Sequence, residues 1–101
     1  MKKNRLYLSG PMSGLPDLNF PAFNAEAQRL RDLGYEVINP VELNPDGGTW
    51  HECMRRDIAA LMDCDKVVLL DGWEKSAGAC LEKDIAARVG IPAGLAKELA
   101  G

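Results

Sequence analysis

Residues 67–82, which read VVLLDGWEKSAGACLE, organise the rest of the chain. The first four are apolar and lie between polar residues, which is typical of a strand buried on both faces of a parallel sheet. The next residues break this pattern, and Ser76 is a suitable N-cap for a helix. Ligands of open α/β sheets bind beside the carboxyl ends of the strands, near helix N-termini. Glu82, behind the small residues Gly78 and Ala79, has space to face such a ligand.

The remaining sequence repeats the order of a strand followed by a helix. Asn19 is a suitable cap for the first helix, and Gly34 is a suitable C′ residue at its end. Thr49 and Glu52 match a capping box at the start of the second helix. We predict strands at residues 5–9, 35–39, 67–70 and 91–93, helices between 19 and 34, from 49 to about 64 and from 76 to about 90, loops at 10–14 and 40–48, and a final helical turn within 94–101.

This alternation predicts the fold class. Strands that are separated by helices imply right-handed crossovers and a parallel sheet with helices on both faces. We therefore expect one α/β domain over residues 1–101, a three-layer α/β/α arrangement of the flavodoxin-like or Rossmann-like kind with three to four strands. So short a sheet favours a homodimer or a higher homo-oligomer that covers part of it.

The composition is that of an ordinary globular protein. Apolar residues make up 47% and charged residues 27% of the 101 residues. The net charge of −3 gives no reason to expect binding to nucleic acid or to a membrane. The amino-terminal residues lead into a strand rather than a signal peptide, and no apolar run is long enough for a membrane span. The three cysteines have no disulfide spacing, which favours a cytoplasmic location.

An acidic residue lies close to the apolar face of the second predicted helix. That face is formed by Trp50, Met54, Ile58 and Leu61. Asp57 follows Met54 by three residues and precedes Leu61 by four, so it lies on or beside the buried stripe. A buried carboxylate is costly without partners, which makes a hydrogen-bonded site one interpretation. The other interpretation is a position at the flank, where Asp57 pairs with Arg56 or another surface cation.

Glu82 is also open to two interpretations. It shares a helix face with Ala79 and Ala86, and these small residues leave room around its carboxylate. Its neighbours Lys83 and Asp84 are typical of a solvated surface, and most helical glutamates are solvated. The pattern alone favours the surface position over the ligand-facing one.

Two further features are candidates for ligand binding. The loop around Ser9, Gly10, Met12 and Ser13 offers backbone N–H groups and hydroxyls to a phosphate, although such a loop is also compatible with a simple turn. It matches neither a Walker loop nor a dinucleotide fingerprint. Trp73, at the carboxyl end of a strand, is able to stack on a base or sugar, or to fill a core or interface.

Metal and cofactor chemistry receive no support from the sequence. His51 is the single histidine, and with Cys53 it lacks the paired ligand spacing of a zinc site. No Ser-His-Asp or Cys-His arrangement is present either. We therefore expect no metal, no cofactor and no thiol nucleophile.

Four stretches together resemble the nucleoside 2-deoxyribosyltransferase superfamily, and most closely the short, often phage- or prophage-encoded proteins of the DUF4406 type. The nucleotide N-hydrolases that cleave deoxynucleoside monophosphates are a close branch. The similarity covers roughly residues 5 to 90, and the motifs occur in the same order and context. The stretches are 7–13 (YLSGPMS), 56–57 (RD), 65–70 (DKVVLL) and 76–86 (SAGACLEKDIA).

The resemblance implies a role for each motif residue. A glutamate in the position of Glu82 attacks the anomeric carbon of the sugar, and the residue in the position of Tyr7 positions it. The match to Asp57 places an acid near the base and the sugar. Ser76 occupies a place that is serine in the monophosphate hydrolases, which favours a 5′-phosphorylated substrate. The candidate substrate-binding residues are Ser9, Gly10, Met12, Ser13, Trp73, Ser76 and Gly78.

The expected activity is N-glycosidic bond cleavage or deoxyribosyl transfer on a deoxynucleoside or its 5′-monophosphate. We expect the dipole and the backbone amides of the helix N-terminus to keep Glu82 ionised. We expect Asp57, on a more apolar helix face, to hold a proton that it gives to the leaving base. Two alternatives remain open: a binding module that holds a nucleotide without cleaving it, and a glycohydrolase acting on NAD.

Overall fold

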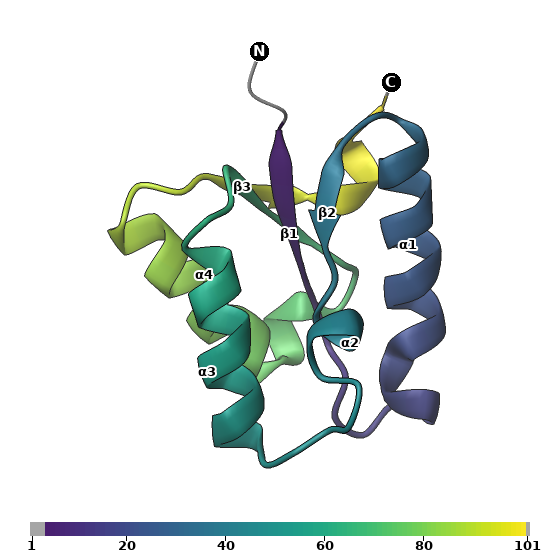
Figure 1. Cartoon of the computed structure of the whole chain (residues 1–101), viewed down its shortest axis with the longest axis vertical. Coiled ribbons are helices and arrows are strands. Elements are labelled where there is room, and N and C mark those ends of the chain that lie inside the picture. Colours follow the sequence, from purple (N-terminus) through teal and green to yellow (C-terminus); the bar gives the residue numbers. More distant parts are fainter. Residues whose placement is uncertain (1–3, 101) are drawn as a thin grey trace.

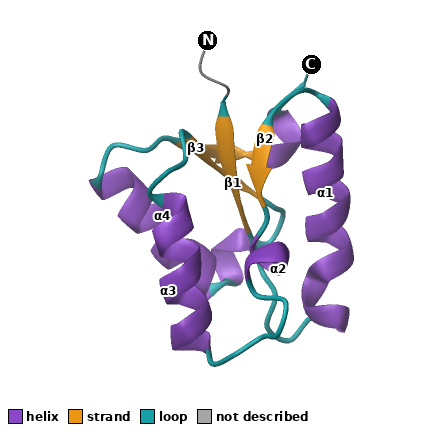
Figure 2. Ribbon diagram, viewed as in Figure 1, coloured by secondary structure: helices purple, strands orange, loops and turns teal. Residues whose placement is uncertain are grey.

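A four-stranded parallel sheet forms the centre of the molecule (Figures 1 and 2). The computed structural model describes residues 4–100. The strand order is β2-β1-β3-β4, and every neighbouring pair is parallel. The strands are β1 (Arg5–Ser9), β2 (Glu36–Ile38), β3 (Lys66–Leu69) and β4 (Ala93–Leu95). The helices are α1 (Phe20–Asp32), α2 (Pro40–Leu43), α3 (Trp50–Leu61) and α4 (Ala77–Arg88), with 3₁₀ turns η1 (Pro16–Asn19), η2 (Trp73–Lys75) and η3 (Ala96–Glu98).

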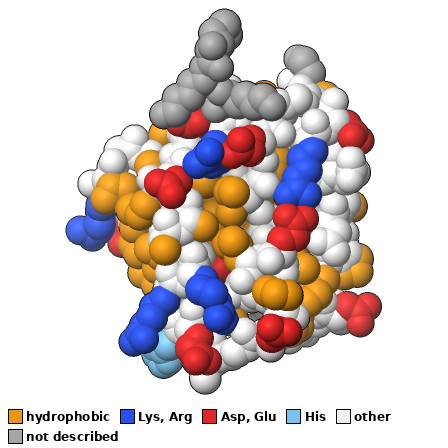
Figure 3. Space-filling view, in the orientation of Figure 1, with side chains coloured by type: hydrophobic (Ala, Val, Ile, Leu, Met, Phe, Trp, Pro, Cys, Tyr) orange, Lys and Arg blue, Asp and Glu red, His pale blue; other side chains and the backbone are white. Residues whose placement is uncertain are grey.

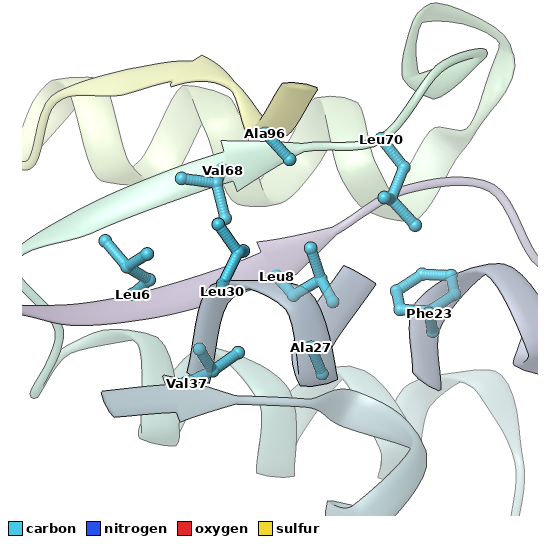
Figure 4. Close-up of a cluster of buried hydrophobic side chains, with 9 residues drawn as sticks. All are labelled: Leu6, Leu8, Phe23, Ala27, Leu30, Val37, Val68, Leu70 and Ala96. Carbon is cyan, nitrogen blue, oxygen red and sulfur yellow. The ribbon is translucent and has the colours of Figure 1, made fainter. Parts of the chain in front are cut away.

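Helices cover both faces of this sheet, so the predicted three-layer α/β/α fold is confirmed. α1 lies on one side of the strands in Figure 1, and α3 and α4 lie on the other. The side chains of a strand alternate between the two faces, and each face therefore has its own core. The α1 side packs Leu6, Leu8, Phe23, Ala27, Leu30, Val37, Val68, Leu70 and Ala96 (Figure 4). The α3 and α4 side packs Tyr7, Leu61, Cys64, Val67, Leu69 and Ala86.

Most predicted caps are confirmed. Thr49 Oγ1 accepts a hydrogen bond from the Glu52 amide at 3.1 Å, and Glu52 Oε1 accepts one from the Thr49 amide at 2.8 Å. Ser76 Oγ accepts from the Ala79 amide at 3.1 Å, as an N-cap does. Gly34 follows α1 with φ of +101°, a left-handed conformation that glycine adopts at little cost.

The prediction for Asn19 as a helix cap is wrong. Asn19 precedes α1, but its φ is +61° and its side chain makes no capping bond. Its Nδ2 instead donates to the Pro11 carbonyl at 3.0 Å, which ties the start of α1 to the loop after β1. Asp17 and Leu18 are left-handed as well, which is unusual for residues other than glycine.

Three segment boundaries also differ from the prediction. Residues 40–43, expected as loop, form α2, because Asn39 Oδ1 accepts from the Val41 amide and caps a short turn. α3 ends at Leu61, about three residues before the expected end. The fourth strand is Ala93–Leu95 rather than 91–93, since the Ile91 amide is still bonded to Ala86 O; the final turn follows from Ala96 to Glu98.

The surface carries charges of both signs. On the face that Figure 3 shows, acidic and basic side chains are interspersed. Some of the charged side chains of the molecule form ion pairs, such as Arg31 with Glu42 at 2.7 Å. None of the helices in residues 4–100 has the length and apolar character that a membrane span requires. Across the same residues, no group of three or more His, Cys, Asp or Glu side chains is arranged to hold a metal ion.

Candidate active site

A buried carboxylate with two hydroxyl donors lies between the sheet and α4. Glu82 is 4% exposed. Its Oε2 accepts a hydrogen bond of 2.7 Å from the Tyr7 hydroxyl, and its Oε1 accepts one of 2.7 Å from Ser9 Oγ. Each carboxylate oxygen therefore has its own donor. The structure brings together three residues that the sequence analysis had singled out.

The two hydroxyls reach Glu82 because they belong to alternate positions of one strand. In β1, Leu6 and Leu8 point into the core on the α1 side, so Tyr7 and Ser9 point to the opposite face. On α4, Ala79, Glu82 and Ala86 are the buried residues, which confirms that they share the face turned toward the sheet. The small side chains beside Glu82 allow the helix to approach β1 closely. The surface interpretation of Glu82 is therefore wrong.

The environment of Glu82 opposes its ionisation. Burial raises the pKa of its carboxyl to about 7, although the hydrogen bonds from Ser9 and Tyr7 lower it and the charge of Asp57 raises it further. The pKa of the Tyr7 hydroxyl is raised well above its usual value by burial and by Glu82, so this hydroxyl remains a donor. The expectation that backbone amides and the helix dipole keep Glu82 ionised is wrong. Its hydrogen-bond donors are hydroxyls, and it lies in the second turn of α4, where the N-terminal amides and the dipole have little effect.

Asp57 is the second buried acid of the site. It is 7% exposed on the inner face of α3, beside Met54 and Leu61. Its Oδ1 accepts a hydrogen bond of 2.9 Å from Asn44 Nδ2. Burial raises the pKa of Asp57, whereas the Asn44 bond and the Arg56 charge lower it. Of the two interpretations from the sequence, the hydrogen-bonded buried position is confirmed.

Both acids line one cavity of about 510 Å³, a volume in the range of small-molecule sites. It opens at the carboxyl end of β1, between the loop that follows this strand and the N-termini of α3 and α4. Its lining comprises Ser9, Gly10, Pro11, Met12, Ser13, Leu18, Phe23, Pro40, Gly48, Trp50, Cys53, Met54, Asp57, Lys75, Ser76, Ala77, Gly78, Ala79 and Glu82. All but two of the predicted site residues are therefore in the lining.

The two exceptions are Tyr7 and Trp73. Tyr7 is fully buried and is connected to the cavity by its hydrogen bond to the Glu82 carboxylate. Trp73, in η2, packs against the core on the α3 and α4 side, and Lys83 Nζ lies 5.5 Å from the centre of its ring. Of the two roles considered for Trp73, the core role agrees with this placement.

Several residues of the cavity were not predicted from the sequence. Trp50 was assigned to the apolar stripe of α3, yet it is 48% exposed and lines the cavity together with Met54. Gly78 admits this close approach, because a Cβ there would lie 3.3 Å from Met54 Sδ and 3.8 Å from Trp50 Nε1. Lys75 is an exposed cation at the cavity beside Ser76. The sequence feature that could have identified Lys75 is its position directly before the predicted helix cap Ser76.

Such a site is suited to chemistry at an acetal-like carbon. A carboxylate that is held by two donors is able to attack or stabilise an electron-poor carbon, and a second acid of raised pKa is able to give or take a proton. Two acids in one cavity are the arrangement that glycosidic cleavage uses. The hydroxyls, the helix N-terminus and Lys75 supply donors for an anionic group.

Comparison with known proteins agrees with the fold and with the resemblance drawn from the sequence. The model of the family described as "Domain of unknown function (DUF4406)" matches residues 4–93. No curated protein matches the chain. Among solved structures, the fold is similar to that of a 2-deoxyribosyltransferase from the psychrotolerant bacterium Bacillus psychrosaccharolyticus, at a TM-score of 0.71 and 22% identity over 90% of this chain and 70% of that chain. That enzyme is described as a biocatalyst for the synthesis of antiviral and antitumoral nucleosides.

Proposed function

The chain belongs to the DUF4406 family, and on that premise we propose that it cleaves the N-glycosidic bond of a deoxynucleoside or its 5′-monophosphate. The observation that carries the proposal is Glu82, buried at the base of the cavity with one hydroxyl donor on each oxygen. The fold shared with a 2-deoxyribosyltransferase supports the same chemical class.

Glu82 acts as the nucleophile. Its ionised carboxylate attacks the anomeric carbon of the sugar while the bond from that carbon to the base nitrogen breaks, and the bonding electrons leave with the base. The transition state resembles an oxocarbenium ion, which an adjacent carboxylate stabilises. The hydrogen bonds from Tyr7 and Ser9 hold both oxygens in place, so little reorganisation is needed at the moment of attack.

Asp57 serves as the acid and then as the base. In its protonated form it gives a proton to the departing base, and the sugar remains attached to Glu82 as an ester. Water, or a second base, then attacks the anomeric carbon and the ester bond breaks, which restores the Glu82 carboxylate. Asp57 accepts the proton that the attacking group loses, so the cycle is balanced.

The remaining lining suits the two ends of a nucleotide. Lys75, Ser76 and the first amides of α4 offer donors for a 5′-phosphate. Trp50 and Met54 offer an apolar wall for a planar base. The predicted preference for a phosphorylated substrate therefore remains part of the proposal. A homodimer or higher homo-oligomer and a cytoplasmic location also remain predictions.

The deciding experiment is a release assay. The purified protein is incubated with the common deoxynucleosides, their 5′-monophosphates, ribonucleotides and NAD, and free base is separated by liquid chromatography. We expect base release from at least one deoxynucleoside or deoxynucleotide. Glu82→Gln should abolish it, and Glu98→Gln, at an exposed glutamate of η3, should not.

The other outcomes separate the alternatives. Release of nicotinamide from NAD alone would identify a glycohydrolase of that cofactor. Thermal stabilisation by a nucleotide with no release from any substrate would identify a binding module. Release that survives Glu82→Gln unchanged would contradict the proposed nucleophile.

A further inference from the structure

The amide of Asn44 is hydrogen-bonded on every side. Asn44 follows α2, and its Nδ2 donates to Asp57 Oδ1 and to the Pro40 carbonyl, both at 2.9 Å. Its Oδ1 accepts from Arg56 Nε at 2.7 Å. Both N–H groups and the carbonyl oxygen are therefore in use.

This network permits only one orientation of the amide. A flip about the side chain would turn Oδ1 toward the Pro40 carbonyl and the Asp57 carboxyl, and would turn Nδ2 toward the Arg56 guanidinium. Acceptors would then face acceptors, and donors would face a donor. Arg56 and the Pro40 carbonyl together therefore orient Asn44 so that it presents a donor, and never an acceptor, to Asp57.

Arg56 is itself fixed by the loop before α3. Its Nη2 donates to the Gly47 carbonyl at 2.9 Å. Gly48, with φ of +128°, leaves room for this contact, since a Cβ there would lie 2.9 Å from Arg56 Nη2. The loop, Arg56 and Asn44 thus form one connected support behind Asp57, which we call the Arg56–Asn44 relay.

The relay distinguishes the two oxygens of Asp57. Oδ1 already receives a donor from Asn44 and has no acceptor there to which it could give a proton. Among residues 4–100, no side-chain or backbone donor reaches Oδ2, and Asp57 is part of the cavity lining. A proton on Asp57 is therefore stable on Oδ2 and not on Oδ1.

We propose that Asn44 and Arg56 are positioning residues that assign the transferable proton of Asp57 to Oδ2, the oxygen left free for the substrate. This inference rests on the proposed glycosidic function, in which Asp57 protonates the leaving base. It adds Asn44 and Arg56 to the residues that serve the reaction. Neither residue lines the cavity, and Arg56 is exposed to solvent.

Carboxyl NMR titration of the whole chain tests the relay without any need for turnover. In Asn44→Ala the ionised form of Asp57 loses its donor, so its titration midpoint should move to higher pH. With a substrate that the wild type cleaves, kcat should fall about tenfold while KM changes less than about twofold, because the proton is no longer held on one oxygen. The same change of midpoint should appear as a shifted limb in the pH dependence of kcat.

Two further variants complete the design. Arg56→Met removes the donor to Asn44 Oδ1 together with a positive charge that lowers the pKa of Asp57, so it should move the midpoint in the same direction even if Asn44→Ala does not fold. Gln28→Ala, in α1 on the opposite side of the sheet, removes an exposed amide that donates a hydrogen bond of 2.8 Å to a carboxylate, Asp32 Oδ1, and should move neither quantity.

The outcomes distinguish the relay from the proposed function. A midpoint that rises in both relay variants supports the relay, and if the wild type also releases no base, the proposed function alone is overturned. If Asn44→Ala and Arg56→Met both fold and both keep the wild-type Asp57 midpoint and kcat, the relay is overturned.

Discussion

The hydroxyl of Tyr7 donates a hydrogen bond of 2.7 Å to Oε2 of Glu82, a residue 75 positions later in the chain. Both groups are almost fully buried. The bond favours the ionised form of Glu82, whereas burial favours the neutral form and raises its pKa to about 7. The fraction of Glu82 that is ready to attack at neutral pH therefore depends on Tyr7.

Tyr7→Phe should shift the pH dependence of the reaction. Without the hydroxyl the ionised carboxylate loses a donor, so the pKa of Glu82 rises and the ascending limb of kcat/KM moves to higher pH. A hydrogen bond to a charged group contributes about 1.5–3 kcal/mol, which corresponds to a loss in kcat of about ten- to a hundredfold at neutral pH. Steady-state rates between pH 5 and 9 measure both effects.

Tyr35→Phe is the matched control for this variant. Tyr35 packs against the core on the α1 side, away from Glu82, and the substitution also removes one hydroxyl while keeping the ring. Its pH profile should coincide with that of the wild type. A Tyr7→Phe profile with an unshifted limb would contradict the role given to the Tyr7 bond.

Glu82 should also make the fold less stable as the pH rises. A carboxyl whose pKa is about 7 in the folded state and near 4.5 in the unfolded state binds more protons when folded. The free energy of unfolding therefore falls with increasing pH between these values, by about 3 kcal/mol in total. Below pH 4.5 both states are protonated, so the full contribution is present and the free energy of unfolding no longer changes with pH through Glu82.

Glu82→Gln removes this titration. Relative to the wild type, the variant should gain about 3 kcal/mol between pH 4.5 and pH 8, because its amide does not ionise. Urea unfolding at both pH values measures the difference. A gain that is the same at both pH values would show that Glu82 does not titrate with a raised pKa.

The sequence predicts the positions of these groups better than their partners. The strand at 5–9 has alternating side chains, and the Ser76 cap sets the rotation of the helix that carries Glu82, so both elements follow from local pattern. The contact between Tyr7 and Glu82 depends on how α4 crosses the sheet, and no local pattern encodes this angle. Only the family resemblance implied it.

Asp57 illustrates a second limit. Its place at the edge of an apolar stripe left two interpretations open, because a rotation of the helix by a fraction of a turn separates them. The partner that resolves the question, Asn44, follows a short helix in a segment that was predicted as loop. α2 arises from a single cap at Asn39, which is too weak a signal to predict from sequence.

The two tryptophans give a direct test of the cavity. Trp50 lines it and Trp73 does not, although Trp73 was the tryptophan named from the sequence as a candidate to stack on a ligand. In a Glu82→Gln background, which prevents turnover, a cleavable deoxynucleotide should quench the tryptophan emission. The quench should persist in Trp73→Phe and disappear in Trp50→Phe. The opposite assignment would place the base-binding wall on η2 and contradict the cavity described here.

Lys75 should recognise the phosphate of a nucleotide rather than its base or sugar. It lines the cavity beside the N-terminus of α4, where backbone amides and the helix dipole also favour an anion. Lys75→Ala should raise KM for a deoxynucleoside monophosphate about tenfold, the equivalent of about 1.4 kcal/mol, and leave KM for the matching deoxynucleoside within about twofold.

Lys83→Ala separates this effect from a general loss of positive charge. Lys83 lies over the Trp73 ring, outside the cavity, so its removal changes the net charge equally without removing a phosphate donor. Both substrates should keep their wild-type KM in that variant. If Lys75→Ala weakens the nucleoside as much as the monophosphate, Lys75 acts on the sugar or on the shape of the cavity. The preference for a phosphorylated substrate would then rest on Ser76 and the loop after β1 alone.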